Sequence, residues 1–97
     1  IMVNLTSEKN VPFDTSCILE PSDYPHFITH STAVYYTDAR LWRLEGLKGF
    51  LANRDNITRK PAVSAQMLAK IQRGALTSDF FPPEYLPLVH ESLLTLP

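Results

Sequence analysis

Residues 33–51 read AVYYTDARLWRLEGLKGFL, and the expected fold is built outward from this stretch. Its first four residues are β-prone and predict a strand. Thr37 or Asp38 comes next, and either side chain can cap the free N–H groups of a first helical turn. Leucines then recur at spacings of three and four, the period of one apolar helical face: Leu41, Leu44, Leu47 and Leu51. The stretch therefore predicts a strand followed by a helix within about 38–52.

The residues before this stretch predict a hairpin. His26-Phe27-Ile28-Thr29 is a strand candidate, and the polar residues 30–32 predict a turn. Residues 33–36 would be the partner strand, so we expect a hairpin within about 26–36. Residues 1–16 show no sustained period, and we expect no regular element there.

The residues after it predict a loop and two more helices. Residues 53–56 are polar and predict a loop, and Ile57-Thr58 suits a brief strand. Ser64 predicts the start of a second helix that Gly74 ends. Pro82-Pro83 predicts the first turn of a third helix. The order predicts a small α+β fold with a β-hairpin, a central helix, two protruding loops and additional C-terminal helices.

Composition excludes several classes of protein. The 97 residues are 44% hydrophobic and 20% charged, which is typical of a globular chain. No apolar run approaches the roughly 18 residues that a bilayer span requires, and no signal peptide is recognisable at the start of the sequence. Cys17 is the only cysteine, which excludes an internal disulfide and a zinc site built on several thiolates.

Charge is distributed unevenly along the chain. Residues 40–73 carry a net charge of +6, whereas residues 1–39 carry −4 and residues 74–97 carry −3. A basic middle is compatible with a nucleic-acid or anionic-lipid surface. The sequence pI of about 6.3 is far below the basic value expected of a nucleic-acid-binding domain. We therefore expect no nucleic-acid partner, and interpret the middle as a solvated face that pairs with the acidic flanks.

The sequence offers weak candidates for metal or nucleophilic chemistry. Cys17, His26 and His30 are the one group of soft ligands, and a closed zinc site needs a fourth. Ser31 beside His30 is a weak indication of a hydrolase, because the side chains of sequence neighbours rarely point at each other as a nucleophile and its base must. The glycines form no phosphate-binding pattern. We expect no metal and no cofactor. The function left to consider is recognition of a partner protein by the surface of two loops, residues 18–25 and 53–61.

In the order and spacing of short motifs, the chain resembles a U-box, the zinc-free relative of the RING domain of E3 ubiquitin ligases. Residues 18–29 match the apolar start of its first loop and a strand that ends in Ile-Thr. Tyr36 stands before the central helix, and Thr58-Arg59-Lys60-Pro61 matches the end of the second loop. A helix with Met67, Leu68 and Ile71 follows. The resemblance covers roughly residues 15–73 and is closest to divergent, RavN-like bacterial effector ligases.

The sequence also departs from the family. Asn56 stands where the family usually has proline, and the glycine common between the first strands is absent. The stretch from Tyr36 to Thr58 is longer than the family pattern. The resemblance implies a division of the chain into three parts. Residues 1–14 would be an N-terminal extension, residues 15–74 the U-box-like domain and residues 75–97 a C-terminal helical extension.

The resemblance implies a scaffolding activity without a covalent intermediate on this chain. A U-box binds a ubiquitin-charged E2 and holds the thioester for transfer to a substrate lysine. Arg59 falls where the family has the residue that orients ubiquitin. The resemblance also implies which residues contact the E2. They are Ile18 and Leu19 for the first loop, either Leu44 or Leu47 for the central helix, and Asn56 and Ile57 for the second loop.

These assignments have alternatives. Ile18 and Leu47 are equally suited to a core, and Arg59 to an ion pair with Asp55 or a C-terminal carboxylate. Leu47 is the helix contact when counted back from the second loop, and Leu44 when counted forward from Tyr36. The implied partners are an E2, ubiquitin and an unknown protein substrate. The implied location is the host cytosol for a secreted effector, or otherwise the cytoplasm. A non-catalytic interaction domain of the same fold is the alternative function.

Overall fold

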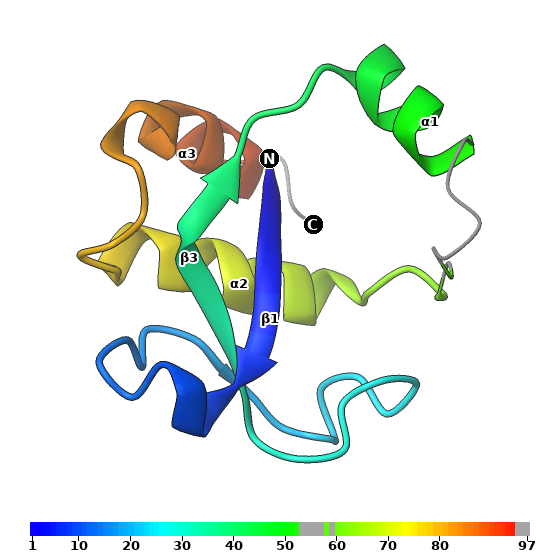
Figure 1. The fold of residues 1–97 in the computed structure, drawn as a ribbon. Helices are drawn as coiled ribbons and strands as arrows, with labels where there is room; N and C mark the ends of the chain where they lie inside the picture. The colour runs from blue at the N-terminus through cyan, green and yellow to red at the C-terminus, as the bar shows by residue number, and fades with distance from the viewer. Residues whose placement is uncertain (53–57, 59, 95–97) are drawn as a thin grey trace.

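A computed structural model describes residues 1–52, 58 and 60–94 of the chain. It shows an α+β fold with a three-stranded antiparallel sheet and three helices, so the predicted fold class is confirmed at that level (Figure 1). The elements, in chain order, are β1 (Met2–Ser7), the 3₁₀ turn η1 (Glu8–Asn10), β2 (Ile18–Leu19), β3 (Thr32–Arg40), α1 (Leu44–Ala52), α2 (Ala65–Thr77), the 3₁₀ turn η2 (Pro83–Tyr85) and α3 (Leu86–Leu94).

The sheet has the order β1-β3-β2, with β3 in the middle. Ile18 pairs with Ala33 and Leu19 with Thr32. The predicted hairpin within 26–36 is therefore wrong, because the strand that precedes β3 lies at 18–19 rather than at 26–29. The N–H groups of Phe27 and Ile28 both donate to the Tyr24 carbonyl, at 3.3 and 3.0 Å, which closes a turn instead of a ladder.

The first residues of the chain form a strand that the sequence analysis did not predict. Met2–Ser7 pairs with β3, and Val3 and Leu5 pack against the core. Only these two apolar residues alternate toward the core, which is too short a pattern to predict a strand. The long partner β3 supplies the ladder that holds β1 in place.

The central helix begins later than predicted. Thr37 and Asp38, the expected helix cap, lie within β3. Met2 pairs with Arg40 and Asn4 with Tyr35, so β3 contributes extra residues opposite β1, as in a β-bulge. The strand thus runs to Arg40, and α1 begins only at Leu44.

Helix α2 begins where the sequence predicts. The Ser64 hydroxyl accepts a hydrogen bond from the Met67 N–H at 3.1 Å. Gly74 does not end the helix, which continues to Thr77. A Cβ at Gly74 would lie 2.6 Å from the Cys17 Cβ and 3.1 Å from the Ser16 carbonyl oxygen. Glycine is therefore used here for close approach and not as a helix end.

One core joins the sheet to α2 and α3. The Tyr36 hydroxyl donates to the Ile71 carbonyl at 2.6 Å and fixes β3 against α2. Pro82-Pro83 leads through η2 into α3, as predicted, and Val89 of α3 is buried. The expected extension 1–14, the expected domain 15–74 and the expected helical extension 75–97 all contribute residues to this core. Leu5, Val34 and Val89 are examples, one from each.

Helix α1 lies outside this arrangement. Figure 1 shows it at the end of β3, away from the layers that the sheet, α2 and α3 form. The structure describes all nine of its residues, and none of them is buried. No helix among the described residues is long and apolar enough to cross a bilayer.

Candidate protein-interaction site

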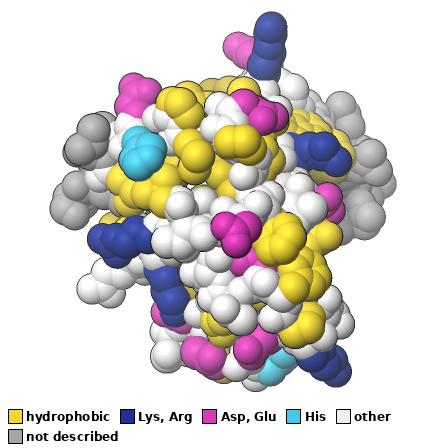
Figure 2. Space-filling view, turned by 90° about the vertical axis from the view of Figure 1, so that its left-hand side faces the viewer, with side chains coloured by type: hydrophobic (Ala, Val, Ile, Leu, Met, Phe, Trp, Pro, Cys, Tyr) yellow, Lys and Arg dark blue, Asp and Glu magenta, His cyan; other side chains and the backbone are white. Residues whose placement is uncertain are grey.

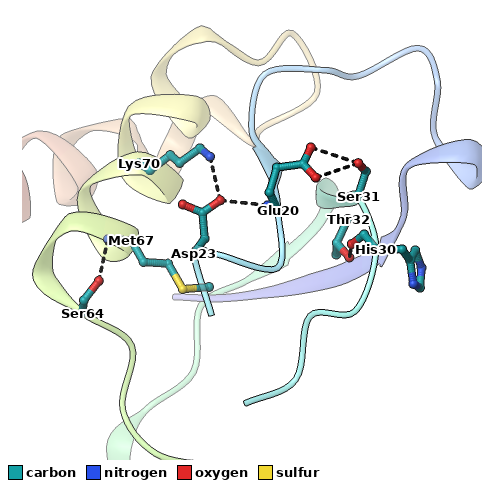
Figure 3. A network of polar contacts seen from close by, with 8 residues as sticks. All are labelled: Glu20, Asp23, His30, Ser31, Thr32, Ser64, Met67 and Lys70. Carbon is teal, nitrogen blue, oxygen red and sulfur yellow. Dashed lines mark hydrogen bonds and ion pairs between the residues drawn. The ribbon is translucent and has the colours of Figure 1, made fainter. Parts of the chain in front are cut away.

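The segment between β2 and β3, residues 20–31, is named here the first loop, and Asp23 organises it. One Asp23 carboxylate oxygen accepts the Glu20 N–H at 2.8 Å and the Lys70 ammonium of α2 at 2.9 Å. Figure 3 shows both contacts converging on Asp23. The loop is thereby closed on itself and tied to α2 by polar side chains.

A second contact closes the base of the first loop. The Ser31 hydroxyl lies 2.9 Å from both carboxylate oxygens of Glu20 and donates its hydrogen to this group (Figure 3). The neighbouring Thr32 hydroxyl donates to the His30 carbonyl at 2.9 Å. These contacts join the two ends of the loop beside the β2–β3 pair.

Tyr24 links the first loop to the chain that enters α2. Its ring is buried, and its hydroxyl donates to the Pro61 carbonyl. Pro61 is the last residue of the expected second loop, 53–61, so this hydrogen bond connects the two expected loops. The contact comes from residues 37 positions apart, which no local pattern in the sequence could indicate.

The first loop presents one large apolar side chain to solvent. Phe27 is 58% exposed, whereas the next residue, Ile28, is 3% exposed. The turn closed on Tyr24 accounts for this contrast, since it directs one side chain inward and leaves the other outside. The β-prone pattern of residues 26–29 predicts a strand and gives no sign that Phe27 is exposed on a turn.

The electrostatics of the first loop favour a charged Asp23. The hydrogen bond from the Glu20 N–H, followed by that from Lys70, lowers the pKa of Asp23 below its ordinary value of 3.8. The Asp23 side chain is 25% exposed and that of Lys70 is 42% exposed, so the pair is partly solvated. A partly solvated ion pair adds little to the free energy of unfolding, so the role of the Asp23–Lys70 pair is to hold the loop in one geometry.

The predicted site residues on β2, directly before the first loop, differ in exposure. Ile18 is half-buried on β2 and can present part of its surface. Leu19 is fully buried in the core, so its side chain is not available to a partner and is left out of the proposed surface. Of the predicted ligand-type residues, Cys17 is buried, and His26 and His30 are exposed. No group of three possible metal-binding side chains occurs within the described ranges.

Leu44 and Leu47 both lie on α1. Leu44 is 63% exposed, and Leu47 is half-buried. Asn56, Ile57 and Arg59 lie outside the described residues, so their predicted roles rest on the sequence alone. Thr58 is described and is not in a strand.

The structure does not bring Ile18 and α1 together. Ile18 pairs with Ala33 at the start of β3, whereas α1 follows Arg40 at its end. The seven steps along β3 from Ala33 to Arg40 span up to about 23 Å in an extended chain. The first loop and α1 thus flank opposite ends of β3 (Figure 1).

An open pocket of about 540 Å³ lies between the sheet, α2 and α3. It is mostly apolar, and residues such as Val3, Tyr36 and Ile71 line it. Gln72 reaches it with a buried side-chain oxygen that has no hydrogen-bond partner among the described residues. Burial raises the pKa of Tyr36 strongly, so this hydroxyl remains protonated. The pocket offers room for an apolar group but, in the described part, no acid–base pair for catalysis.

Comparison with known proteins gives no match for this chain from any protein-family model, any curated protein or any solved structure.

Proposed function

We propose that this chain is a U-box-like E3 ubiquitin ligase module that binds a ubiquitin-charged E2 and promotes transfer to a substrate lysine. The observation that carries the proposal is the first loop, which hydrogen bonds and an ion pair between polar groups hold closed, as the resemblance to a zinc-free U-box implies. Asp23, Glu20 and Lys70 close it, and Tyr24 joins it to Pro61. This arrangement adds to the motif order from which the resemblance was inferred.

The proposed mechanism is orientation of bound partners. Ile18 on β2 and Phe27 in the first loop offer apolar contacts for an E2, and Leu44 or Leu47 adds one from α1. Truncating one such anchor in a small interface costs about 1–3 kcal/mol of binding free energy. Transfer is accelerated because the thioester is held in a reactive geometry, and this chain supplies no nucleophile.

Arg59 is proposed to contact E2 and ubiquitin together, because a guanidinium presents five donors in a fixed fork. Arg59→Ala is expected to lower the single-turnover discharge of E2-linked ubiquitin onto free lysine more than it lowers affinity for free E2. Arg59→Lys should rescue the rate only in part. Equal losses in discharge and affinity would make Arg59 an E2 contact only.

The test of the proposal is autoubiquitination with a panel of E2 enzymes. A ladder of ubiquitin chains that depends on this domain is expected with at least one of them. Absence of chains with every E2, together with no E2 binding in NMR titrations, would contradict the proposal. A fall in the thermal unfolding midpoint after chelator treatment would contradict the zinc-free fold. The proposed setting is a bacterial effector in a host cytosol, acting on an unidentified protein substrate.

A second candidate function is a non-catalytic interaction domain of the same fold. The observation that favours it is the separation of Ile18 from α1 along β3. An E2 that contacts both would require α1 to move or the E2 to span the strand. Asn56 in place of the family's proline points the same way. E2 binding without discharge would establish this candidate over the ligase.

A further inference from the structure

We propose that residues 40–52, named here the basic apolar segment, bind the surface of a membrane that contains anionic phospholipids. The segment consists of the end of β3, a short connection and α1. This proposal does not rest on the ubiquitin ligase function. It assigns the segment a partner class from its exposed apolar side chains and its cations.

The apolar side chains of the segment remain in contact with water. Leu44 is 63% exposed, Leu41 is 55% exposed and Trp42 is 38% exposed. No residue of α1 is buried against the rest of the described chain. Removing apolar surface from water is favourable, so this segment gains free energy from any apolar layer that covers it.

The apolar groups of α1 share one side. At 100° per residue, Leu44, Leu47 and Leu51 fall within a narrow arc, and Phe50 borders it. Trp42 packs on the Phe50 ring, with centroids 5.3 Å apart in an edge-on arrangement. The opposite side carries Glu45, Gly46, Gly49 and Ala52. A helix with leucines and aromatic rings on one side is suited to lie in the plane of a bilayer interface.

The cations of the segment complement an anionic surface. Arg40, Arg43 and Lys48 are exposed, and Glu45 is the segment's one carboxylate. Their long side chains can keep the charge at the phosphate level while the apolar groups enter deeper. The whole chain has a net charge of −1, so the attraction must be local to this segment.

An anionic bilayer accounts for the segment better than a nucleic acid does. Phosphate contacts would use the three cations but would leave the leucines and Trp42 in water. Figure 2 views the molecule from the α3 side, which is turned away from α1, and there acidic and basic side chains are interspersed, so the cations of the segment do not continue as a track over that side. A bilayer uses both the charge and the apolar side of the segment.

Trp42 is the only tryptophan of the chain, which makes it a direct probe. The full chain is titrated, without E2, with vesicles of phosphatidylcholine and phosphatidylserine, and with vesicles of phosphatidylcholine alone. A blue shift of Trp42 emission and quenching by lipids with brominated acyl chains are expected with the anionic vesicles. Added salt should weaken the binding, because it screens the charges.

A matched pair of charge reversals tests the assignment. Lys48→Glu is expected to weaken vesicle binding by on the order of tenfold. Lys9→Glu makes the same change on η1, which follows the far end of β1, and should leave binding within about twofold of the original chain. Circular dichroism checks that both variants retain their helices.

Several results would overturn the proposal. These are no emission shift with either vesicle, an equal shift with both, or an equal loss of binding in the Lys48→Glu and Lys9→Glu variants. A larger Trp42 response to duplex DNA or RNA than to anionic vesicles would assign the cations to nucleic acid instead. Because no E2 is present, these outcomes are independent of the ligase test, although Leu44 and Leu47 belong to both surfaces.

Discussion

Gly74 lies where α2 comes closest to the sheet, and the lack of a side chain allows that approach. The neighbouring groups are the Tyr36 hydroxyl, the Cys17 side chain and the Ser16 backbone, and the backbone has little freedom to move. Gly49 on α1 provides a contrast, because a Cβ there would meet nothing within 4 Å among the described residues. The same residue type thus serves a packing role in one helix only.

Gly74→Ala is expected to destabilise the fold by about 1–3 kcal/mol, since the added methyl must push α2 from the sheet. Gly49→Ala should be neutral or stabilise the chain by up to about 1 kcal/mol through helix propensity. Urea unfolding followed by circular dichroism measures both changes. An unchanged midpoint for Gly74→Ala would mean that α2 does not approach Cys17 as closely as described.

Ile18 and Leu19 are neighbours with opposite environments. Ile18→Ala is expected to reduce E2 affinity by about 5- to 150-fold and to leave the domain folded, because the side chain is only half-buried. Leu19→Ala removes a fully buried side chain and should destabilise the fold by about 2–5 kcal/mol. E2 titration and urea unfolding are measured for both. If Ile18→Ala unfolds the chain, Ile18 is a core residue and the E2 contact lies elsewhere.

At the scale of elements, α2 positions the first loop. Lys70 contacts Asp23, and the chain that enters α2 contacts Tyr24 through Pro61. The loop has no regular backbone ladder, so its geometry depends on these side-chain contacts. Their loss is expected to affect recognition before it affects the core.

Asp23 makes the first loop sensitive to acid. The pKa of Asp23 is lower in the folded chain than its ordinary value of 3.8, so folding favours the charged form. The stability that it contributes is present above about pH 4 and is lost as the pH falls through the folded pKa. The urea midpoint of Asp23→Asn should therefore lie below that of the original chain at pH 7, and the difference should shrink as the pH falls from 7 to 3.

Asp79→Asn serves as the control, because Asp79 is an exposed carboxylate outside the first loop. It removes one negative charge away from Glu20 and Lys70, so any pH dependence that Asp23→Asn shows beyond that of Asp79→Asn is assigned to those two contacts. The same pH dependence in both variants would mean that Asp23 is not held by Glu20 and Lys70 in solution. NMR titration of the Asp23 carboxyl gives the folded pKa directly.

At the scale of the whole molecule, one core holds β2, β3 and α2 around Cys17. The thiol is 3% exposed, and burial raises its pKa above the ordinary value of 9.0. A neutral, enclosed thiol reacts poorly with alkylating reagents. Cys17 is therefore a reporter of the opening of the entire core.

Labelling of Cys17 in native buffer is expected to proceed at the rate of the unfolded chain multiplied by the unfolded fraction. Mass spectrometry after timed exposure to iodoacetamide measures the rate, and the urea-unfolded chain supplies the reference. Gly74→Ala should label faster by the factor that its loss of stability predicts. Labelling much faster than global unfolding allows would show that β2 and α2 separate locally.

The sequence by itself determined the α+β class, the cap of α2 at Ser64 and the helical start after Pro82-Pro83. These features depend on side chains close to the backbone groups that they satisfy or constrain, so a local pattern predicts them. It also placed Leu44 and Leu47 on one helix. The motif order that suggested a U-box belongs to the same level, since it uses only residue type and spacing.

Tertiary structure alone decided which strand pairs with β3, how far β3 extends and what the first loop presents. Residues 26–29 are as β-prone as many strands, but the Tyr24 carbonyl binds the N–H groups of Phe27 and Ile28. Thr37 and Asp38 suit a helix cap, yet the residues on either side of them, Tyr35 and Arg40, pair with β1, so the strand runs through both positions. The contacts from Tyr24 to Pro61 and from Asp23 to Lys70 span 37 and 47 positions. Such distant partners are chosen by packing of the whole chain, which local propensity does not contain.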